Sequence, residues 1–173
     1  MADSNMKVRA GRYVADLDHD VVVFIIGMRI NKLHAPHKWL PVFAAMPKMI
    51  TELMKEPELG LLARPRTFVS GRTVLLHQVW SSFDKLDAYA RDRDAEHLPA
   101  WRAFNRKIRD DGSVGIFHET YLVGPGRCET VYGNMPPFGL GAALGARPAR
   151  EAGQTAPSRL TGDQDDVAPV EPY

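Results

Sequence analysis

The sequence predicts an α+β fold of the ferredoxin-like type, with the order β-α-β-β-α-β and one extra C-terminal strand. Short β-branched and apolar stretches alternate with two longer stretches whose apolar residues recur every three or four positions. Only a turn signal separates the two middle strands. This order is typical of the split βαβ arrangement, in which both helices cover one face of an antiparallel sheet.

The strands follow from residue type and spacing. Residues 21–30 are β-branched and apolar, and residues 114–123 alternate. Ser70-Gly71 is a turn signal between residues 61–69 and 73–80, and it predicts a hairpin. A short extra strand is expected at residues 129–132.

Two helices are expected, at residues 37–55 and 83–109, because apolar residues line one face of each. Ser81 or Ser82 can cap the second helix. Pro47 lies inside the first pattern and predicts a kink or a break near Met46.

The ends of the chain are polar, so we divide it into an irregular arm (1–19), a domain (20–146) and a disordered tail (147–173). Helices on one side leave the other face of the sheet apolar and uncovered. Because such a face is buried when it packs against the same face of a second copy, we expect a homodimer.

Composition excludes several classes of protein. The chain has 173 residues and is 45% hydrophobic, values typical of a globular domain. Its formal net charge is only +1, so its charge gives no reason to expect a nucleic-acid partner. No apolar run approaches the roughly 20 residues that span a membrane. Cys128 is the one cysteine. We expect a soluble, cytoplasmic protein with neither a membrane nor a nucleic-acid partner.

Candidate site residues begin with His97, which shares a helix face with Trp101 and Arg93. His97 could act as a general base, as a metal or haem ligand, or as a core histidine with one hydrogen bond. Trp101 and Arg93 are candidates for substrate binding.

His77 and His118 lie in the middle of two strands that we expect to be adjacent and buried. They suggest either a polar pocket or two histidines whose hydrogen-bonding groups find partners across a dimer interface. No histidine spacing matches a familiar zinc pattern, so no metal is expected. Arg29 ends a strand and either faces solvent or orients a carbonyl group. Trp80 is a core residue or a wall of the site.

Residues 79–86 and 97–101 resemble the strand–helix signature of the antibiotic-biosynthesis monooxygenase superfamily, which has a dimeric α/β-barrel fold. Residues 115–121 and 129–137 resemble a branch related to a fungal monooxygenase of fumagillin biosynthesis. Together the resemblance covers roughly residues 18–146.

The resemblance implies a homodimer and a pocket between helices and sheet, and it leaves three functions open. One is oxygenation of a hydrophobic, polyketide-like small molecule without a cofactor, with His97 as base and His77 or Arg29 as stabilisers. Another is a haem-dependent dehydratase or oxygenase with His97 as the iron ligand. The third is a non-catalytic binder of apolar ligands.

Overall fold

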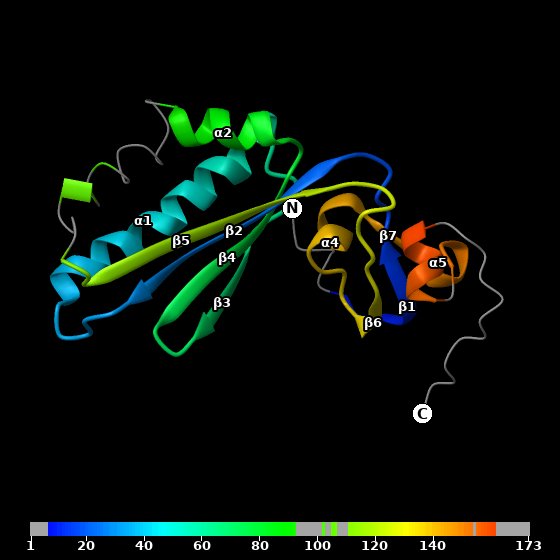
Figure 1. Ribbon diagram of the computed structural model, residues 1–173, viewed down its shortest axis with the longest axis horizontal. Coiled ribbons are helices and arrows are strands. Elements are labelled where there is room, and N and C mark those ends of the chain that lie inside the picture. The colour runs from blue at the N-terminus through cyan, green and yellow to red at the C-terminus, as the bar shows by residue number, and fades with distance from the viewer. Residues whose placement is uncertain (1–6, 93–101, 103–104, 107–110, 154, 162–173) are drawn as a thin grey trace. The chain divides into compact units, whose positions relative to one another are not determined.

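The computed structural model describes residues 7–92, 102, 105–106, 111–153 and 155–161, and the chain divides into two compact units. Unit 1 comprises Met1–Asp20 and Val123–Tyr173, and unit 2 comprises Val21–Leu122. Each is described by itself below, with the element labels of Figure 1.

Unit 2 contains a four-stranded sheet with the order β3-β4-β2-β5. Its strands are β2 (Val21–Ile30), β3 (Arg66–Ser70), β4 (Thr73–Trp80) and β5 (Val114–Val123, whose last residue belongs to unit 1). The hairpin β3–β4 lies on one side of β2 and β5 on the other, as the split βαβ arrangement requires. The predicted ferredoxin-like fold is therefore confirmed.

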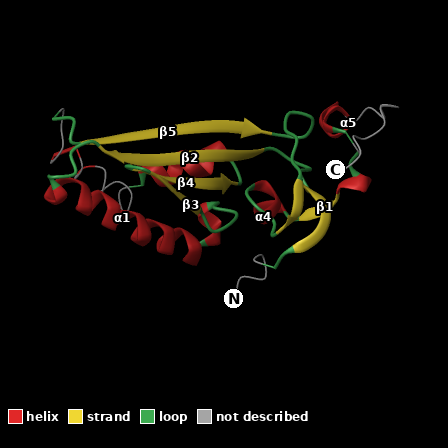
Figure 2. Cartoon of the chain, turned by 90° about the horizontal axis from the view of Figure 1, so that it is seen from below, coloured by secondary structure: helices red, strands yellow, loops and turns green. Residues whose placement is uncertain are grey.

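The sheet is antiparallel. β2 pairs with β4 in an unbroken register from Val22↔Trp80 to Arg29↔Thr73. The end of β2 meets the start of β5, because the amide of Asn31 donates to the carbonyl oxygen of Ser113 at 3.0 Å. Accordingly, the arrows of β2 and β5 point in opposite directions in Figure 2.

Helices α1 (Pro36–Lys55) and α2 (Phe83–Arg91) lie on the same side of this sheet (Figure 1). Ser82 caps α2 as predicted, since its hydroxyl accepts from the amide of Lys85. The break expected near Met46 is absent, because α1 continues through Pro47. The main core between helices and sheet consists of Val22, Leu53, Leu61, Trp80, Leu86 and Tyr89, with Phe24 and Leu59 packed against it.

Unit 1 holds a three-stranded sheet in which β1 (Arg9–Ala15) lies between β6 (Tyr132–Met135) and β7 (Ala146–Pro148). Both pairs are antiparallel. The short helices α4 (Leu140–Leu144) and α5 (Ala156–Thr161) belong to this unit, as does the 3₁₀ turn η3 (Ala149–Glu151). A second 3₁₀ turn, η2 (Pro57–Leu59), belongs to unit 2.

Three expectations are corrected here. Residues 9–15 form a strand where an irregular arm was expected, and residues 146–161 contain β7, η3 and α5 where a disordered tail was expected. The extra strand starts at Tyr132 and joins the sheet of unit 1, not that of unit 2. β1 was not expected because it contains Gly11, with φ +92°, and a bulge, so its apolar and polar residues do not alternate cleanly. It forms a strand because residues far away in the sequence provide hydrogen-bond partners for its backbone.

Among the described residues, no helix is both long and apolar enough to span a bilayer.

Candidate functional site

The helix-covered face of the unit 2 sheet is where the family resemblance implies a ligand pocket. Successive strand side chains point to opposite faces, so the buried Val22 and Trp80 identify which residues share the helix side. On β4 this set includes Gln78. On β5 it includes His118, whose ring centroid lies 5.8 Å from that of Phe24. This face thus carries polar side chains as well as the core.

Two buried or half-buried hydrogen bonds lie in this layer. The indole Nε1 of Trp80 donates to Oε1 of Gln78 at 2.8 Å, and both residues are buried. The hydroxyl of Tyr89 in α2 donates to Oε2 of Glu52 in α1 at 2.7 Å, which links the two helices. The rings of Trp80 and Tyr89 are 5.8 Å apart. Trp80 is 1% exposed, so its place is in the core.

His77 and His118 do not form a common pocket. β2 lies between their strands, and His77 pairs with Ile25 on β2 and with Arg66 on β3, on the face opposite to the helices. Partial burial there lowers the pKa of the His77 imidazole below its ordinary value, so the ring is neutral at pH 7. The expectation of two adjacent, buried strands is corrected: β2 separates β4 from β5, and the part of β5 around His118 is exposed.

Arg29 lies on the same open face as His77, at the end of β2. It is exposed, and its Nη1 donates to Oγ1 of Thr73 at 3.5 Å. Side chains on this face point away from the helix-covered side. The roles of Arg29 and His77 as stabilisers stay predictions.

His97, Trp101 and Arg93 lie outside the described residues. Their roles as base or iron ligand, cavity wall and substrate contact stay predictions. Among the described residues, no group of three or more His, Cys, Asp and Glu side chains could hold a metal ion. Burial, followed by the nearby Glu129, raises the pKa of the Cys128 thiol, which does not favour a nucleophilic thiolate.

The Tyr132 and Asn134 motif, which carried the more specific resemblance, has structural contacts in unit 1. The Tyr132 hydroxyl accepts from the amide of Gly141 in α4 at 3.0 Å. Asn134 adopts a positive φ of 51°, and its Oδ1 accepts from the amide of Gly11 at 2.8 Å. The motif therefore ties β6 to α4 and to the bulged part of β1.

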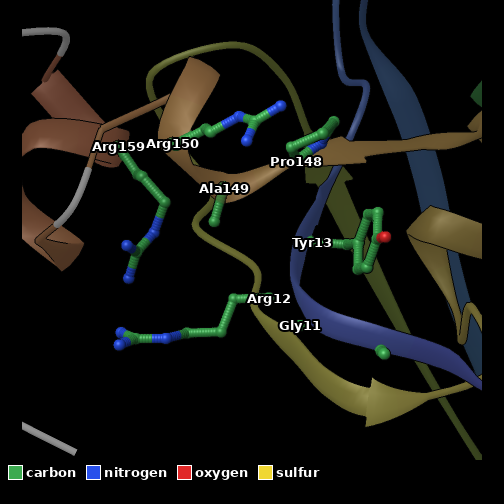
Figure 3. A pocket seen from close by; sticks show the side chains of 8 residues that line it. Gly11, Arg12, Tyr13, Pro148, Ala149, Arg150 and Arg159 are labelled. Carbon is green, nitrogen blue, oxygen red and sulfur yellow. The ribbon is translucent and has the colours of Figure 1, made fainter.

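A pocket in unit 1 was not foreseen from the sequence. It has a volume of about 310 Å³ and is lined by residues of β1 and of the 148–159 region (Figure 3). Arg12, Arg150 and Arg159 stand around it. These arginines come from opposite ends of the chain, so no local motif could reveal them. The residues that line the pocket are Ala10, Gly11, Arg12, Tyr13, Pro148, Ala149, Arg150 and Arg159.

Among solved structures, the chain is similar to two described as aldoxime dehydratase. One, in complex with butyraldoxime, matches with a TM-score of 0.61 and 17% identity, over 81% of this chain and 44% of the other. The second matches with a TM-score of 0.62 and 17% identity, over 83% and 42%. At this identity the likeness shows the fold alone.

A curated relative is monooxygenase af470 of Aspergillus fumigatus, which is 34% identical over 130 residues. The match covers 70% of this chain and 45% of the relative, so the chain spans less than half of that protein's length. The family model of the af470-like monooxygenases matches residues 21–140, which include the whole sheet and both helices of unit 2. The expected branch of the superfamily is confirmed, and the chain belongs to the monooxygenase af470-like family.

Proposed function

We propose that this protein is an oxidoreductase of the monooxygenase type, acting on a hydrophobic, polyketide-like small molecule. The observation that carries the proposal is the family match over residues 21–140. The proposed site is the helix-covered face of the unit 2 sheet, where an apolar layer is interrupted by a few polar groups. Such a mixture is typical of small-molecule pockets.

The proposed chemistry needs no cofactor. A substrate with an acidic CH₂ group next to a carbonyl loses a proton to a base, and the resulting enolate gives two electrons to molecular oxygen as a C–O bond forms. The peroxide is protonated to a hydroperoxide, which loses water and leaves a new carbonyl group, so that one oxygen atom enters the substrate and the other leaves as water. The protein has to supply the base, donors for the enolate oxygen and a dry cavity. We assign the base to His97 and a cavity wall to Trp101. His118 is the described histidine on the helix-covered face of the sheet, and we propose it as a further donor toward the substrate.

Oxygen uptake with polyhydroxylated aromatic compounds tests this function. Wild-type protein should consume oxygen, and His97→Ala should abolish the consumption without loss of folding by circular dichroism. His118→Ala should reduce it. His34→Ala is the matched control, because His34 is exposed in the loop before α1. Full turnover by His97→Ala would contradict the assignment, and binding of substrates without any consumption would favour a non-catalytic binder.

A haem-dependent dehydratase is the second candidate, because the fold is shared with the aldoxime dehydratases. His97 would be the iron ligand and haem would supply the metal centre. An absorption spectrum before and after addition of hemin separates the candidates: a Soret band that saturates at one haem per chain supports the second, and its absence supports the first.

We further propose that the open face of the unit 2 sheet pairs with a second copy of the chain. Phe68, Phe117 and Tyr121 on this face are 44%, 36% and 48% exposed, which is unusual for aromatic side chains in a sheet. Phe117→Asp should convert a dimer to a monomer in light scattering after size exclusion. Phe43→Asp, at a 46% exposed position of α1, is the matched control and should stay dimeric. A wild-type monomer at micromolar concentration would refute the interface.

A further inference from the structure

The pocket of unit 1 has walls of two kinds. Pro148 and Ala149 give it an apolar side, and Ala149 is only 6% exposed. The Tyr13 ring lies on the side of β1 away from Arg12 (Figure 3). The remaining wall is formed by arginine side chains from β1, η3 and α5 (Figure 3). A volume of about 310 Å³ is at the small end of the range for ligand sites. The pocket therefore suits a small molecule with one apolar and one charged part.

Arg159 is fixed in place. Its side chain is 10% exposed, and its Nη2 and Nε donate to Oε1 of Glu129 at 2.5 and 2.7 Å. Its Nη1 donates to the carbonyl oxygen of Gly153 at 3.2 Å. The helix that carries it is held by reciprocal bonds between Thr155 and Ser158, each side-chain oxygen accepting from the other residue's amide at 3.2 Å. The pocket thus has one ordered guanidinium that does not depend on a ligand.

The pocket carries more positive than negative charge. Glu129 balances Arg159, but among the described residues no carboxylate forms an ion pair with Arg12 or Arg150. In Figure 3, Arg12 and Arg159 extend to the same side of the pocket. Gathered cations of this kind repel one another unless an anion lies among them.

We propose that this pocket binds a small molecule that carries a carboxylate or phosphate group on an apolar body. Arg12 donates to the oxyanion, and Arg159 supplies a fixed positive charge beside it. Arg150 contributes from the rim. The apolar body packs against Pro148 and Ala149. A guanidinium suits both oxyanions because its parallel N–H groups match two oxygens at once. This site belongs to unit 1 and does not depend on the function proposed for unit 2.

Calorimetric titration of the full chain at low ionic strength tests the proposal. The probes are phenyl phosphate, benzoate and, as a neutral analogue of the same size, benzyl alcohol. At least one anion should bind with saturation at one site per chain, and benzyl alcohol should not. Arg12→Gln should weaken the binding about tenfold, the effect of losing a charge-assisted hydrogen bond, and Arg150→Gln should weaken it less.

Arg91→Gln is the matched control, because it removes the same charge from an exposed side chain that pairs only locally with Asp87. The control should bind as wild type does. The absence of saturable binding by either anion would overturn the proposal. Equal weakening by Arg91→Gln and Arg12→Gln would also overturn it, because the effect would then be one of net charge. Whichever anion binds more tightly identifies the chemical class of the ligand.

Discussion

The indole of Trp80 donates its one hydrogen bond to Gln78, two residues earlier on the same face of β4, and both side chains are buried beneath the helices. The buried indole N–H thus has an acceptor in the buried amide oxygen of Gln78. A buried polar group that loses its partner lowers the free energy of unfolding, so the loss of this one hydrogen bond should destabilise the protein.

Gln78→Leu should lower the free energy of unfolding by about 1–3 kcal/mol, because it leaves the Trp80 N–H without an acceptor. Urea denaturation followed by tryptophan fluorescence measures the loss. In a Trp80→Phe background the same substitution should cost much less, because no N–H remains to be satisfied. Equal costs in the two backgrounds would show that the pair is not coupled.

Gly27 allows the Phe117 ring to lie directly on β2. A Cβ at residue 27 would be 2.5 Å from Cζ of Phe117 and 2.7 Å from the carbonyl oxygen of Val74. Gly27→Ala should therefore destabilise the protein by about 1–3 kcal/mol in urea denaturation, the usual cost of overpacking. Gly115→Ala is the control: its Cβ would meet no atom closer than 3.7 Å, and it should be tolerated. Similar losses in both would contradict this account.

His77 should make the protein less stable at mildly acidic pH. Burial lowers its pKa in the folded state, so the unfolded chain binds a proton more readily. The free energy of unfolding is therefore highest above the pKa of the unfolded histidine, which is about 6.5. It falls as the pH drops from there toward the folded pKa. His77→Gln should flatten this fall in urea midpoints measured between pH 7.5 and 5, whereas His34→Gln should leave it unchanged.

Tyr132→Phe should destabilise unit 1 by about 0.5–1.5 kcal/mol, the net contribution of one hydrogen bond, because the buried amide of Gly141 then keeps only the carbonyl oxygen of Phe138, at 2.9 Å, as an acceptor. Thermal unfolding followed by circular dichroism measures the shift. Tyr121→Phe removes an exposed hydroxyl that donates to Glu119, and it should change stability by less than about 0.5 kcal/mol. A Tyr132→Phe protein as stable as wild type would mean that water replaces the lost contact.

Local patterns predicted unit 2 well and unit 1 poorly. Residues 21–30 and 114–123 are strands at the expected bounds, because their composition and alternation are decided within ten residues. β1 was missed because the residues that stabilise it are far away in the sequence: Arg9 pairs with Met135, and the amide of Ala15 donates to Oγ1 of Thr130. The same distance hid the pocket around Arg12, Arg150 and Arg159.

For the candidate site residues on the sheet, the sequence could not predict which face of the sheet each one occupies. Each of His77 and His118 was placed correctly in mid-strand, but which face each one occupies depends on the order of strands in the sheet. A shift of one residue reverses the face of a side chain, and the insertion of β2 between two strands removes their contact. Sequence patterns fix neither quantity directly.

The pairing of β1 with β6 and β7 also bears on how the chain acquires its structure. During synthesis Arg9–Ala15 is made early, but the residues that hydrogen-bond to it lie at 132–135 and 146–148. Unit 2, which is continuous in sequence, has all its strands available before then. We therefore expect unit 2 to form first on the ribosome. β1 then stays without partners until residues 132–148 have emerged, a delay during which a chaperone can protect its unpaired backbone.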